Sequence, residues 1–297
     1  DKVVELLEKA IADGPLSAVN ELNAATPFEE LTITTQDEHT RATLKIQEGC
    51  NNHCTYCIIP SVRGPIRSRS LTNIREETER LVAAGYTELV LTGIHLSSYG
   101  KDLGDGSTLL DAIRAVHEVE GVQRIRLGSL EPTIATEAFS QSLAAMPKVC
   151  PQFHLALQSG SNTVLARMAR RYNMTMYMQA VENLRAAFPH AAFTTDVLTG
   201  FPGETEEEYQ ETRRMIEQVG YAKIHVFPYS QREGTKAAVM PNQLPNALKD
   251  QRARELIALG ETTARAYQES WLGCTATVLV EEQDAVGNWL GYTPEYI

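Results

Sequence analysis

Short apolar runs rich in β-branched residues alternate with amphipathic stretches from residue 41 to residue 227. Apolar residues on a helical period predict helices, and short apolar runs between turn signals predict buried strands. The apolar runs predict six strands, at 42–47, 88–92, 124–128, 153–157, 192–198 and 221–227. The amphipathic stretches predict five intervening helices, at 72–84, 109–119, 135–145, 174–187 and 205–219. Such alternation indicates βαβ units, so we expect an α/β fold with a partial, open six-stranded parallel (βα) barrel.

The two flanks of this alternation have different patterns. Residues 1–12 predict a helix ended by Asp13-Gly14-Pro15, and a linker-like stretch follows it. A long helical pattern covers residues 246–271, and two short strands of a small β module are predicted at 275–280 and 288–292. We therefore divide the chain into an N-terminal tail and linker (1–40), a core barrel (41–245), a connecting helix (246–272) and the start of a β domain (273–297).

The composition is that of an ordinary globular protein, with 43% hydrophobic and 22% charged residues among 297. The sequence has no apolar run of about 18 residues for a membrane span and no basic-plus-apolar signal segment. Five cysteines, three of them clustered, do not form a disulfide framework. We therefore expect a cytoplasmic protein without a membrane partner.

The net charge of −11 argues against a protein that coats nucleic acid non-specifically, because that binding needs a Lys/Arg surface. Any nucleic-acid contact must therefore be local. Arg63, Arg67 and Arg69 follow the clustered cysteines directly and are candidates for phosphate contact. The alternative is that they pair with nearby carboxylates, at Glu76, Glu77 and Glu79. A second basic group is formed by Arg167, Arg170 and Arg171.

The clustered cysteines, Cys50, Cys54 and Cys57, have the spacing C-x3-C-x2-C and follow the first predicted strand. Three thiolates on one short loop can face a single metal centre, and no fourth cysteine follows at the spacing that a ferredoxin or a zinc module needs. A cubane cluster held by three cysteines keeps one iron open to a small molecule. Structural zinc is the alternative. Cys150 and Cys274 lie in unrelated segments, where we expect structural roles.

The ends of the predicted strands are polar and rich in glycine. Ligands of parallel α/β folds bind at the carboxyl ends of the strands, so these positions are candidates for a cofactor site. They include Gly93 after the second strand, Glu131 after the third, Gln158 after the fourth, and the turn Gly200-Phe201-Pro202-Gly203-Glu204 after the fifth. Thr205 and Glu208 then form the pattern of a capping box, which predicts that a helix begins just past this turn.

Several of these motifs together closely resemble those of the radical S-adenosylmethionine (SAM) methylthiotransferases. The resemblance covers the cysteine loop with Tyr56 before its third cysteine, and later the motifs His154-Leu155, Leu157-Gln158-Ser159-Gly160-Ser161, Gly200-Phe201-Pro202-Gly203-Glu204-Thr205 and Tyr229-Ser230. Within the family, Leu91-Thr92-Gly93-Ile94-His95 and Ser129-Leu130-Glu131-Pro132 look most like the branch that acts on N6-threonylcarbamoyladenosine beside the tRNA anticodon. Sister branches act on isopentenyladenosine in tRNA or on a ribosomal-protein aspartate.

The resemblance implies a transferase that adds a methylthio group to C2 of the modified adenosine. It implies that Cys50, Cys54 and Cys57 hold a 4Fe-4S cluster, and that SAM is bound by Tyr56, Gly93, Glu131, Gln158, Gly200, Phe201, Gly203 and Glu204. Arg63, Arg67 and Arg69 would meet the tRNA. The resemblance also implies an N-terminal domain whose own three cysteines bind a second 4Fe-4S cluster, which is expected only in the full-length protein because residues 1–40 contain no cysteine. Residues 273–297 resemble only the opening of the family's C-terminal TRAM-type RNA-binding domain.

The resemblance also implies an electron donor such as flavodoxin or ferredoxin, and we expect a monomer. Two small departures from the family pattern are Ser61-Val62, where an aromatic residue is common, and Ala156, where proline is expected. Two other hypotheses remain open at this point. One is a non-catalytic, metal-stabilised scaffold, and the other is a radical enzyme that transfers a different group.

Overall fold

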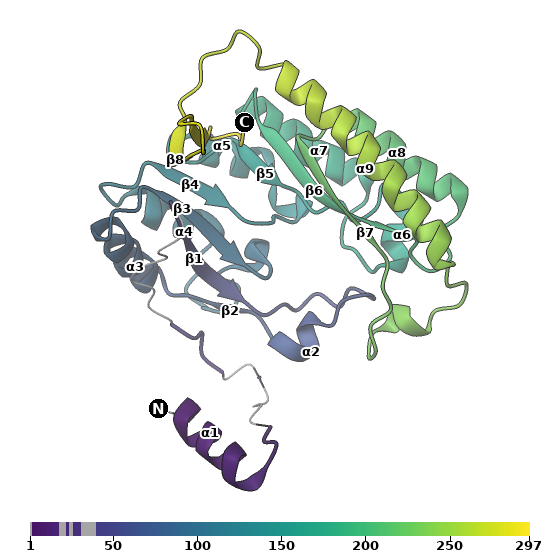
Figure 1. Ribbon diagram of the computed structural model, residues 1–297, viewed down its shortest axis with the longest axis horizontal. Coiled ribbons are helices and arrows are strands. Elements are labelled where there is room, and N and C mark those ends of the chain that lie inside the picture. The colour runs from purple at the N-terminus through teal and green to yellow at the C-terminus, as the bar shows by residue number, and fades with distance from the viewer. Residues whose placement is uncertain (1, 18–21, 24–25, 31–39) are drawn as a thin grey trace.

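The structure is a computed structural model that describes residues 2–17, 22–23, 26–30 and 40–297 (Figure 1). Its centre is a strongly curled, open sheet that confirms the predicted fold class. The six parallel strands are β1 (Arg41–Glu48), β3 (Glu88–Gly93), β4 (Arg124–Leu127), β5 (Gln152–His154), β6 (Ala192–Thr199) and β7 (Lys223–Pro228). They pair in two groups, β1-β3-β4 and β5-β6-β7, and the short strand β2 (Arg67–Ser68) pairs antiparallel with β1 at the edge of the first group. Isolated parallel bridges such as Leu130 to Leu155 join the groups.

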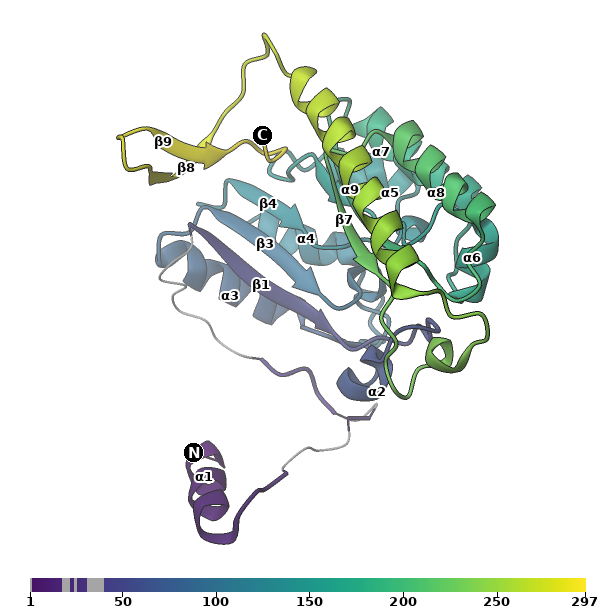
Figure 2. The same ribbon diagram turned by 45° about the vertical axis from the view of Figure 1, so that its right-hand side comes forward.

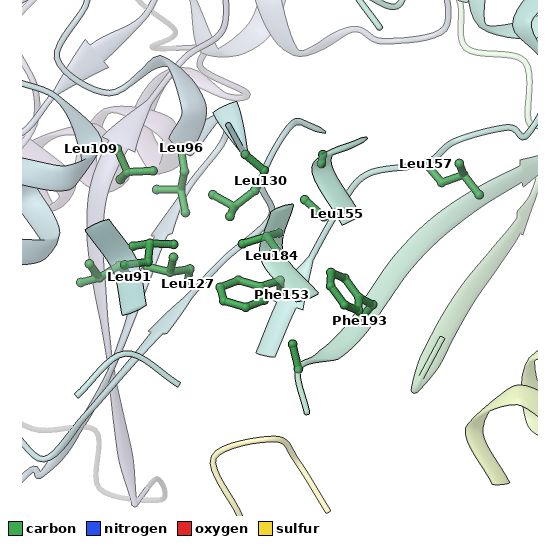
Figure 3. Close-up of a cluster of buried hydrophobic side chains, with 14 of the residues drawn as sticks. Leu91, Leu96, Leu109, Leu127, Leu130, Phe153, Leu155, Leu157, Leu184 and Phe193 are labelled. Carbon is green, nitrogen blue, oxygen red and sulfur yellow. The ribbon is translucent and has the colours of Figure 1, made fainter. Parts of the chain in front are cut away.

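The helices lie on the outer face of this sheet, as Figure 2 shows. They are α3 (Leu71–Ala83), α4 (Leu109–His117), α5 (Glu137–Ala144), α7 (Met174–Ala187), α8 (Glu206–Val219) and α9 (Asn246–Glu269). Alternate strand residues point outward and bury apolar surface against the helices. In Figure 3, Leu91, Leu127, Phe153 and Phe193 from four strands lie in this layer with Leu184 of α7.

The opposite, inner face of the sheet is polar. Along β6 the residues Phe193, Thr195 and Val197 are buried, whereas Thr194, Asp196 and Leu198 are partly exposed. Side chains alternate between the faces of a strand, so the partly exposed set lines the inside of the curled sheet. His225 of β7 is exposed and pairs in register with Asp196. The inside of the open barrel is therefore accessible and hydrophilic.

Most of the predicted boundaries agree with the structure to within about two residues, but some short elements were missed. These are α2 (Ile59–Arg63), the antiparallel β2 (Arg67–Ser68), α6 (Asn162–Arg167) and the 3-10 turns η1 (Leu96–Ser98), η2 (Pro132–Ile134) and η3 (Lys236–Val239). The prediction that strand β5 reaches residue 157 was wrong. The amide of Leu157 donates to the Thr195 hydroxyl and not to a backbone carbonyl, so regular pairing ends earlier.

The flanking segments follow the prediction in kind. Helix α1 (Lys2–Asp13) forms and lies apart from the barrel in both ribbon views. At the other end, β8 (Leu279–Gln283) and β9 (Trp289–Tyr292) form an antiparallel hairpin, so the first of these strands begins four residues later than the predicted 275. Among the described helices, none is both long and apolar enough to span a membrane.

The segment after β9 is held against the amino-terminal end of the sheet by Arg126. This fully buried side chain, 1% exposed, pairs with Glu88 at 2.5 Å and donates to the carbonyls of Thr293 and Pro294 at 2.9 and 2.6 Å. Its guanidinium also lies 3.5 Å from the ring centroid of Tyr296. The end of the barrel opposite the cysteine loop is therefore covered by this segment.

Candidate functional site

The three cysteines lie on a loop, residues 49–57, that leaves the carboxyl end of β1. Gly49 begins it with a φ of +69°, and a Cβ at this position would lie 1.8 Å from the carbonyl oxygen of Pro65, so only glycine fits. The amide of Cys50 donates to Gly64, and the amide of Thr55 donates to the carbonyl of Met168 at 3.1 Å. This metal loop is therefore tied both to the chain that follows it and to the end of α6.

The thiols share one region of the loop. Cys54 is buried, Cys50 and Cys57 are half-buried, and all three are free. Burial raises the pKa of Cys50 and of Cys57, and the charges of the neighbouring thiols raise both further. Thiols in this situation stay protonated until a cation replaces the protons. This donor set fits a thiolate-bound cluster.

In the part of the chain that the structure describes, no group of three or more His, Cys, Asp or Glu side chains is arranged to hold a metal ion. This absence concerns sites that hold one metal ion. Two sulfurs bound to the same zinc lie at most about 4.6 Å apart, because each Zn–S bond is about 2.3 Å. In a cubane, each thiolate binds a different iron, and the sulfurs lie farther apart.

A polar network from three other parts of the barrel converges on Cys54. Arg170, beyond α6, donates to the Cys54 sulfur at 3.2 Å and contacts Glu131 at 3.1 Å. Glu131, after β4, lies 3.2 Å from Nε2 of His95, and the Asn52 amide nitrogen lies 3.3 Å from the same atom. Burial raises the pKa of Glu131, but its hydrogen bond with His95 and the charge of Arg170 outweigh this, so the pKa is lowered and the carboxylate stays ionised.

Gly93 and Gln47 join the end of β3 to the start of the metal loop. A Cβ on Gly93 would lie 2.9 Å from the Gln47 side chain, so this glycine makes room for the glutamine. Gln47 Oε1 accepts from the backbone amide of His95 at 2.7 Å, and its Nε2 donates to the carbonyl of Gly49 at 2.8 Å. The sequence predicted a role for Gly93 but not for Gln47 or His95. Their only signal in the sequence was their position, just before the cysteine loop for Gln47 and at the end of the motif Leu91-Thr92-Gly93-Ile94-His95 for His95.

Buried contacts with helix α9 fix the conformation of the turn at residues 200–204. The buried carboxylate of Glu204 accepts from the Gly200 amide at 2.9 Å and pairs with Arg252 at 2.6 Å. Gly200 has a φ of +70°, and a Cβ there would lie 2.2 Å from Cγ of Lys249, so helix α9 and not a ligand explains this glycine. Phe201 is fully buried. Contact between this turn and a ligand must therefore come from its backbone.

A cavity of about 470 Å³ lies beside Cys57, between the metal loop and the end of β7. Its lining is mostly aromatic and apolar: Tyr56, Cys57, Ile58, Ile59, Leu198, Phe227, Pro228, Tyr229, Ser230 and Arg232. The ring of Phe201 packs edge-on against Tyr56 and Tyr229, with centroids 6.5 and 5.5 Å apart. The buried Tyr229 hydroxyl has no hydrogen-bond partner among the described residues. Such a cavity suits a flat, apolar ring.

A larger cavity of about 730 Å³ lies elsewhere, between the loop at residues 97–110 and α5. Its lining has only Lys101 and Tyr99 as ionisable side chains and includes no cysteine, so it does not offer the chemistry found at the metal loop.

Gln158 is in the left-handed backbone region, with a φ of +62°. Its amide donates to the carbonyl of Asp196 and its carbonyl accepts from Leu198, so β6 holds the backbone in place. This conformation costs a non-glycine residue roughly 1–2 kcal/mol. Strain of this kind is concentrated at functional sites, which supports the choice of Gln158 as a candidate.

The three arginines after the metal loop differ in their surroundings. Arg67 and Arg69 are buried, and they lie 3.9 Å from Glu48 and 3.4 Å from Glu77. Arg63 also pairs with Glu48, but its side chain is 46% exposed. The structure therefore favours internal ion pairing for Arg67 and Arg69, and leaves Arg63 on the surface.

The match to known families decides between the hypotheses for the metal loop. A profile of the Radical SAM superfamily matches residues 44–216, a region that contains the metal loop and strands β3 to β6. The chain belongs to the radical SAM superfamily. This membership explains why three cysteines without a fourth ligand follow the first strand.

Similar radical SAM proteins include tRNA-modifying enzymes. The chain is 41% identical over 287 residues to the threonylcarbamoyladenosine tRNA methylthiotransferase MtaB of Bacillus subtilis, covering 95% of this chain and 64% of that protein. It is 40% identical to MtaB of Chlamydia pneumoniae, covering 86% and 60%. It is 38% identical to the tRNA-2-methylthio-N(6)-dimethylallyladenosine synthase of Streptomyces coelicolor, covering 86% and 50%. The chain thus spans less than two thirds of the length of each of these relatives. These identities confirm the resemblance to the methylthiotransferases that the motifs indicated.

Solved structures of radical SAM enzymes share the fold. The radical S-adenosylmethionine methyltransferase TsrM from Kitasatospora setae, with cobalamin and a 4Fe-4S cluster bound, matches with a TM-score of 0.57 and 16% identity over 67% of this chain and 36% of that one. Methylornithine synthase, PylB, matches with a TM-score of 0.52 and 15% identity over 74% and 62%.

Proposed function

We propose that this chain is the catalytic barrel of an enzyme that adds a methylthio group to C2 of N6-threonylcarbamoyladenosine next to the tRNA anticodon. The observation that carries the proposal is the metal loop itself. Three cysteines lie on one short loop at the carboxyl end of β1, and a network of Asn52, His95, Glu131 and Arg170 contacts Cys54. The similarity to methylthiotransferases at 41% identity supports the choice of reaction.

Each part of the rim has a role in this proposal. Cys50, Cys54 and Cys57 would hold a 4Fe-4S cluster, the ionised Glu131 would accept a hydrogen bond from the amino group of SAM, and Gln158 would contact the ribose. The aromatic cavity at Tyr56 and the backbone of residues 200–204 would take the adenine ring. A reduced cluster with SAM supplies one-electron chemistry that can remove hydrogen from an unactivated adenine carbon, which no side-chain acid or base can do.

The remaining tasks of the chain are orientation and exclusion of water. Gln47 fixes the start of the metal loop against β3, and the contact of Thr55 with Met168 fixes its middle against α6. Phe201, Tyr56 and Tyr229 pack into an aromatic wall beside Cys57. A packed aromatic wall of this kind limits the access of water and so the side reactions of reactive species.

The inner face of the barrel supports the choice of a polar substrate. His154, Asp196 and His225 lie there together, with the two imidazole rings stacked at 6.2 Å and His154 Nε2 3.5 Å from Asp196. A threonylcarbamoyl group is polar and carries a carboxylate, whereas an isopentenyl group is apolar. Hydrogen-bonding groups favour the former because an apolar partner would leave them unpaired. Both MtaB relatives are named for the threonylcarbamoyl substrate.

The proposal includes the partners of the reaction. These are tRNA as substrate and an electron donor such as flavodoxin or ferredoxin, in the cytoplasm, with the enzyme acting as a monomer. The proposal also includes a second 4Fe-4S cluster in the full-length protein. Its only support is the resemblance to the methylthiotransferases.

Anaerobic reconstitution followed by iron and sulfide analysis tests the proposed function. We expect one 4Fe-4S cluster per chain, with a broad visible absorbance, and formation of 5'-deoxyadenosine from SAM on reduction. Zinc without visible absorbance would instead show a structural scaffold. Mass analysis of tRNA nucleosides from cells that lack the full-length gene tests the substrate, and loss of the methylthio group from threonylcarbamoyladenosine alone is expected.

Substitution of Arg63 tests the tRNA contact. We expect Arg63→Ala to weaken tRNA binding and to reduce the salt slope of the affinity by about one, because one phosphate contact is lost. Filter binding across a salt series measures both quantities. Arg75→Ala is the matched control, since Arg75 is 50% exposed and pairs with Glu79 on helix α3. Unchanged binding by Arg63→Ala would show that this arginine serves only its pair with Glu48.

A further inference from the structure

One largely buried arginine side chain contacts both halves of the proposed cofactor site. The guanidinium of Arg170 is 9% exposed, and one of its nitrogens donates to the Cys54 sulfur at 3.2 Å. Another of its nitrogens lies 3.1 Å from Oε1 of Glu131. A single rigid cation therefore links a thiol of the metal loop to the carboxylate at the end of β4.

The local fold fixes this guanidinium in place. Helix α6 ends in a turn at Ala169, which has a φ of +56°, and the amide of Arg170 donates to the carbonyl of Leu165 at 2.9 Å. The ring of Tyr172 lies 4.9 Å from the guanidinium carbon, and its hydroxyl donates to the carbonyls of Ala156 and Leu157. The side chain of Arg170 is thus held against a buried aromatic ring that is itself anchored.

The chemistry of this contact bears on the reduction of a cluster. Hydrogen bonds to cluster sulfurs and nearby charges set reduction potentials, and reduction adds one negative charge. A cation favours the more negative, reduced form, most strongly where water is excluded. Arginine suits this role because its guanidinium keeps its charge at any physiological pH. Arg232 is a second cation whose charge acts on Cys57, but among the described residues it donates no hydrogen bond to a thiol.

We propose that Arg170 is a positioning residue that raises the reduction potential of the cluster through Cys54 and holds Glu131 in the orientation that SAM requires. The proposal rests on the proposed function, since it assumes a cluster on the metal loop. The proposal gives Arg170 a role that the two other arginines of the second basic group do not share, because neither of their side chains donates a hydrogen bond to Cys54 in the described part of the chain. Arg167 pairs with Glu208 at 2.7 Å, and Arg171 is exposed.

The test compares Arg170→Met with Arg171→Met in the full chain after anaerobic reconstitution. The two variants lose the same charge from adjacent positions, but only Arg170 touches a thiol. A potentiometric titration followed by electron paramagnetic resonance, without SAM, measures the midpoint. For Arg170→Met we expect the ratio of reduced to oxidised cluster at a fixed potential to fall at least tenfold, which equals about 59 mV for one electron. Arg171→Met should titrate as the wild type.

The other outcomes are equally informative. An unchanged midpoint in Arg170→Met, or an equal shift in Arg171→Met, would overturn the proposal, the latter because it would show an effect of net charge alone. If Arg170→Met takes up no iron, the midpoint of Arg170→Gln decides: a wild-type value there overturns the proposal and a lower one supports it, because glutamine keeps side-chain N–H donors but carries no charge. Failure of the wild-type chain to bind iron would contradict the proposed function instead.

Discussion

Replacing any one of Cys50, Cys54 and Cys57 by Ala is expected to abolish iron binding and SAM cleavage together. Each thiolate would hold a different iron of the cluster, and the described part of the metal loop offers no replacement ligand of the same kind, since the nearby His53 is exposed. Iron and sulfide content after anaerobic reconstitution, together with 5'-deoxyadenosine formation measured by liquid chromatography, gives both readouts. We expect iron at the background level and product below about one thousandth of the wild-type amount, because a removed cofactor leaves no alternative route.

The two other cysteines provide the controls for this experiment. Cys150 is buried, burial raises its pKa to about 11, and it borders a cavity that is also lined by Thr277 and Pro294, near the segment after β9. Cys274 is exposed after α9, with its sulfur 4.0 Å from the carbonyl of Ser270. Iron content should be unchanged in Cys150→Ala and Cys274→Ala. Full SAM cleavage in any of the three metal-loop variants would show that these cysteines do not hold the catalytic cluster.

The sequence was sufficient for the fold because its information is local. Each strand of the barrel is a short apolar run, and each long helix has an amphipathic period, so their order alone indicates a parallel sheet. The capping box of Thr205 and Glu208 was predicted and is present. Short elements such as β2 were missed because two residues carry no period. Strand β2 forms only because its two residues pair with Gln47 and Glu48 of β1, which are about 20 residues away in the sequence.

The site was predictable only where a residue type signals its own chemistry. Three clustered cysteines do so, and the position of Glu131 after a strand made it a candidate. Arg170 was not, because it contacts Cys54 from 116 residues away and the sequence shows only one arginine in a basic group. The burial of Arg67 and Arg69 was equally hidden. Basic residues outside a core and basic residues paired within it look the same in a sequence.

Removing Arg126 is expected to have the largest effect on stability. Arg126→Met leaves the carboxylate of Glu88, which is 1% exposed, without its closest partner and also removes the donors to Thr293 and Pro294. Breaking a buried ion pair by removing one partner typically costs about 3–5 kcal/mol, because the buried charge loses its compensation. The remaining cation, Arg124, lies 3.5 Å from Glu88 and compensates its charge only in part. We expect a loss of this size in the free energy of unfolding, measured by urea denaturation followed by circular dichroism.

Two further variants separate this effect from a general loss of charge. Arg114→Met removes an exposed pair with Asp111 on helix α4, and such pairs contribute less than about 1 kcal/mol. The double variant Glu88→Gln with Arg126→Met removes both charges, so we expect it to be more stable than Arg126→Met alone, because no buried charge is left unpaired. If Arg126→Met instead costs no more than Arg114→Met, the segment after β9 does not depend on this pair. Its docking would then rest on the remaining contacts, such as those of Arg124 with Tyr292 and Thr277.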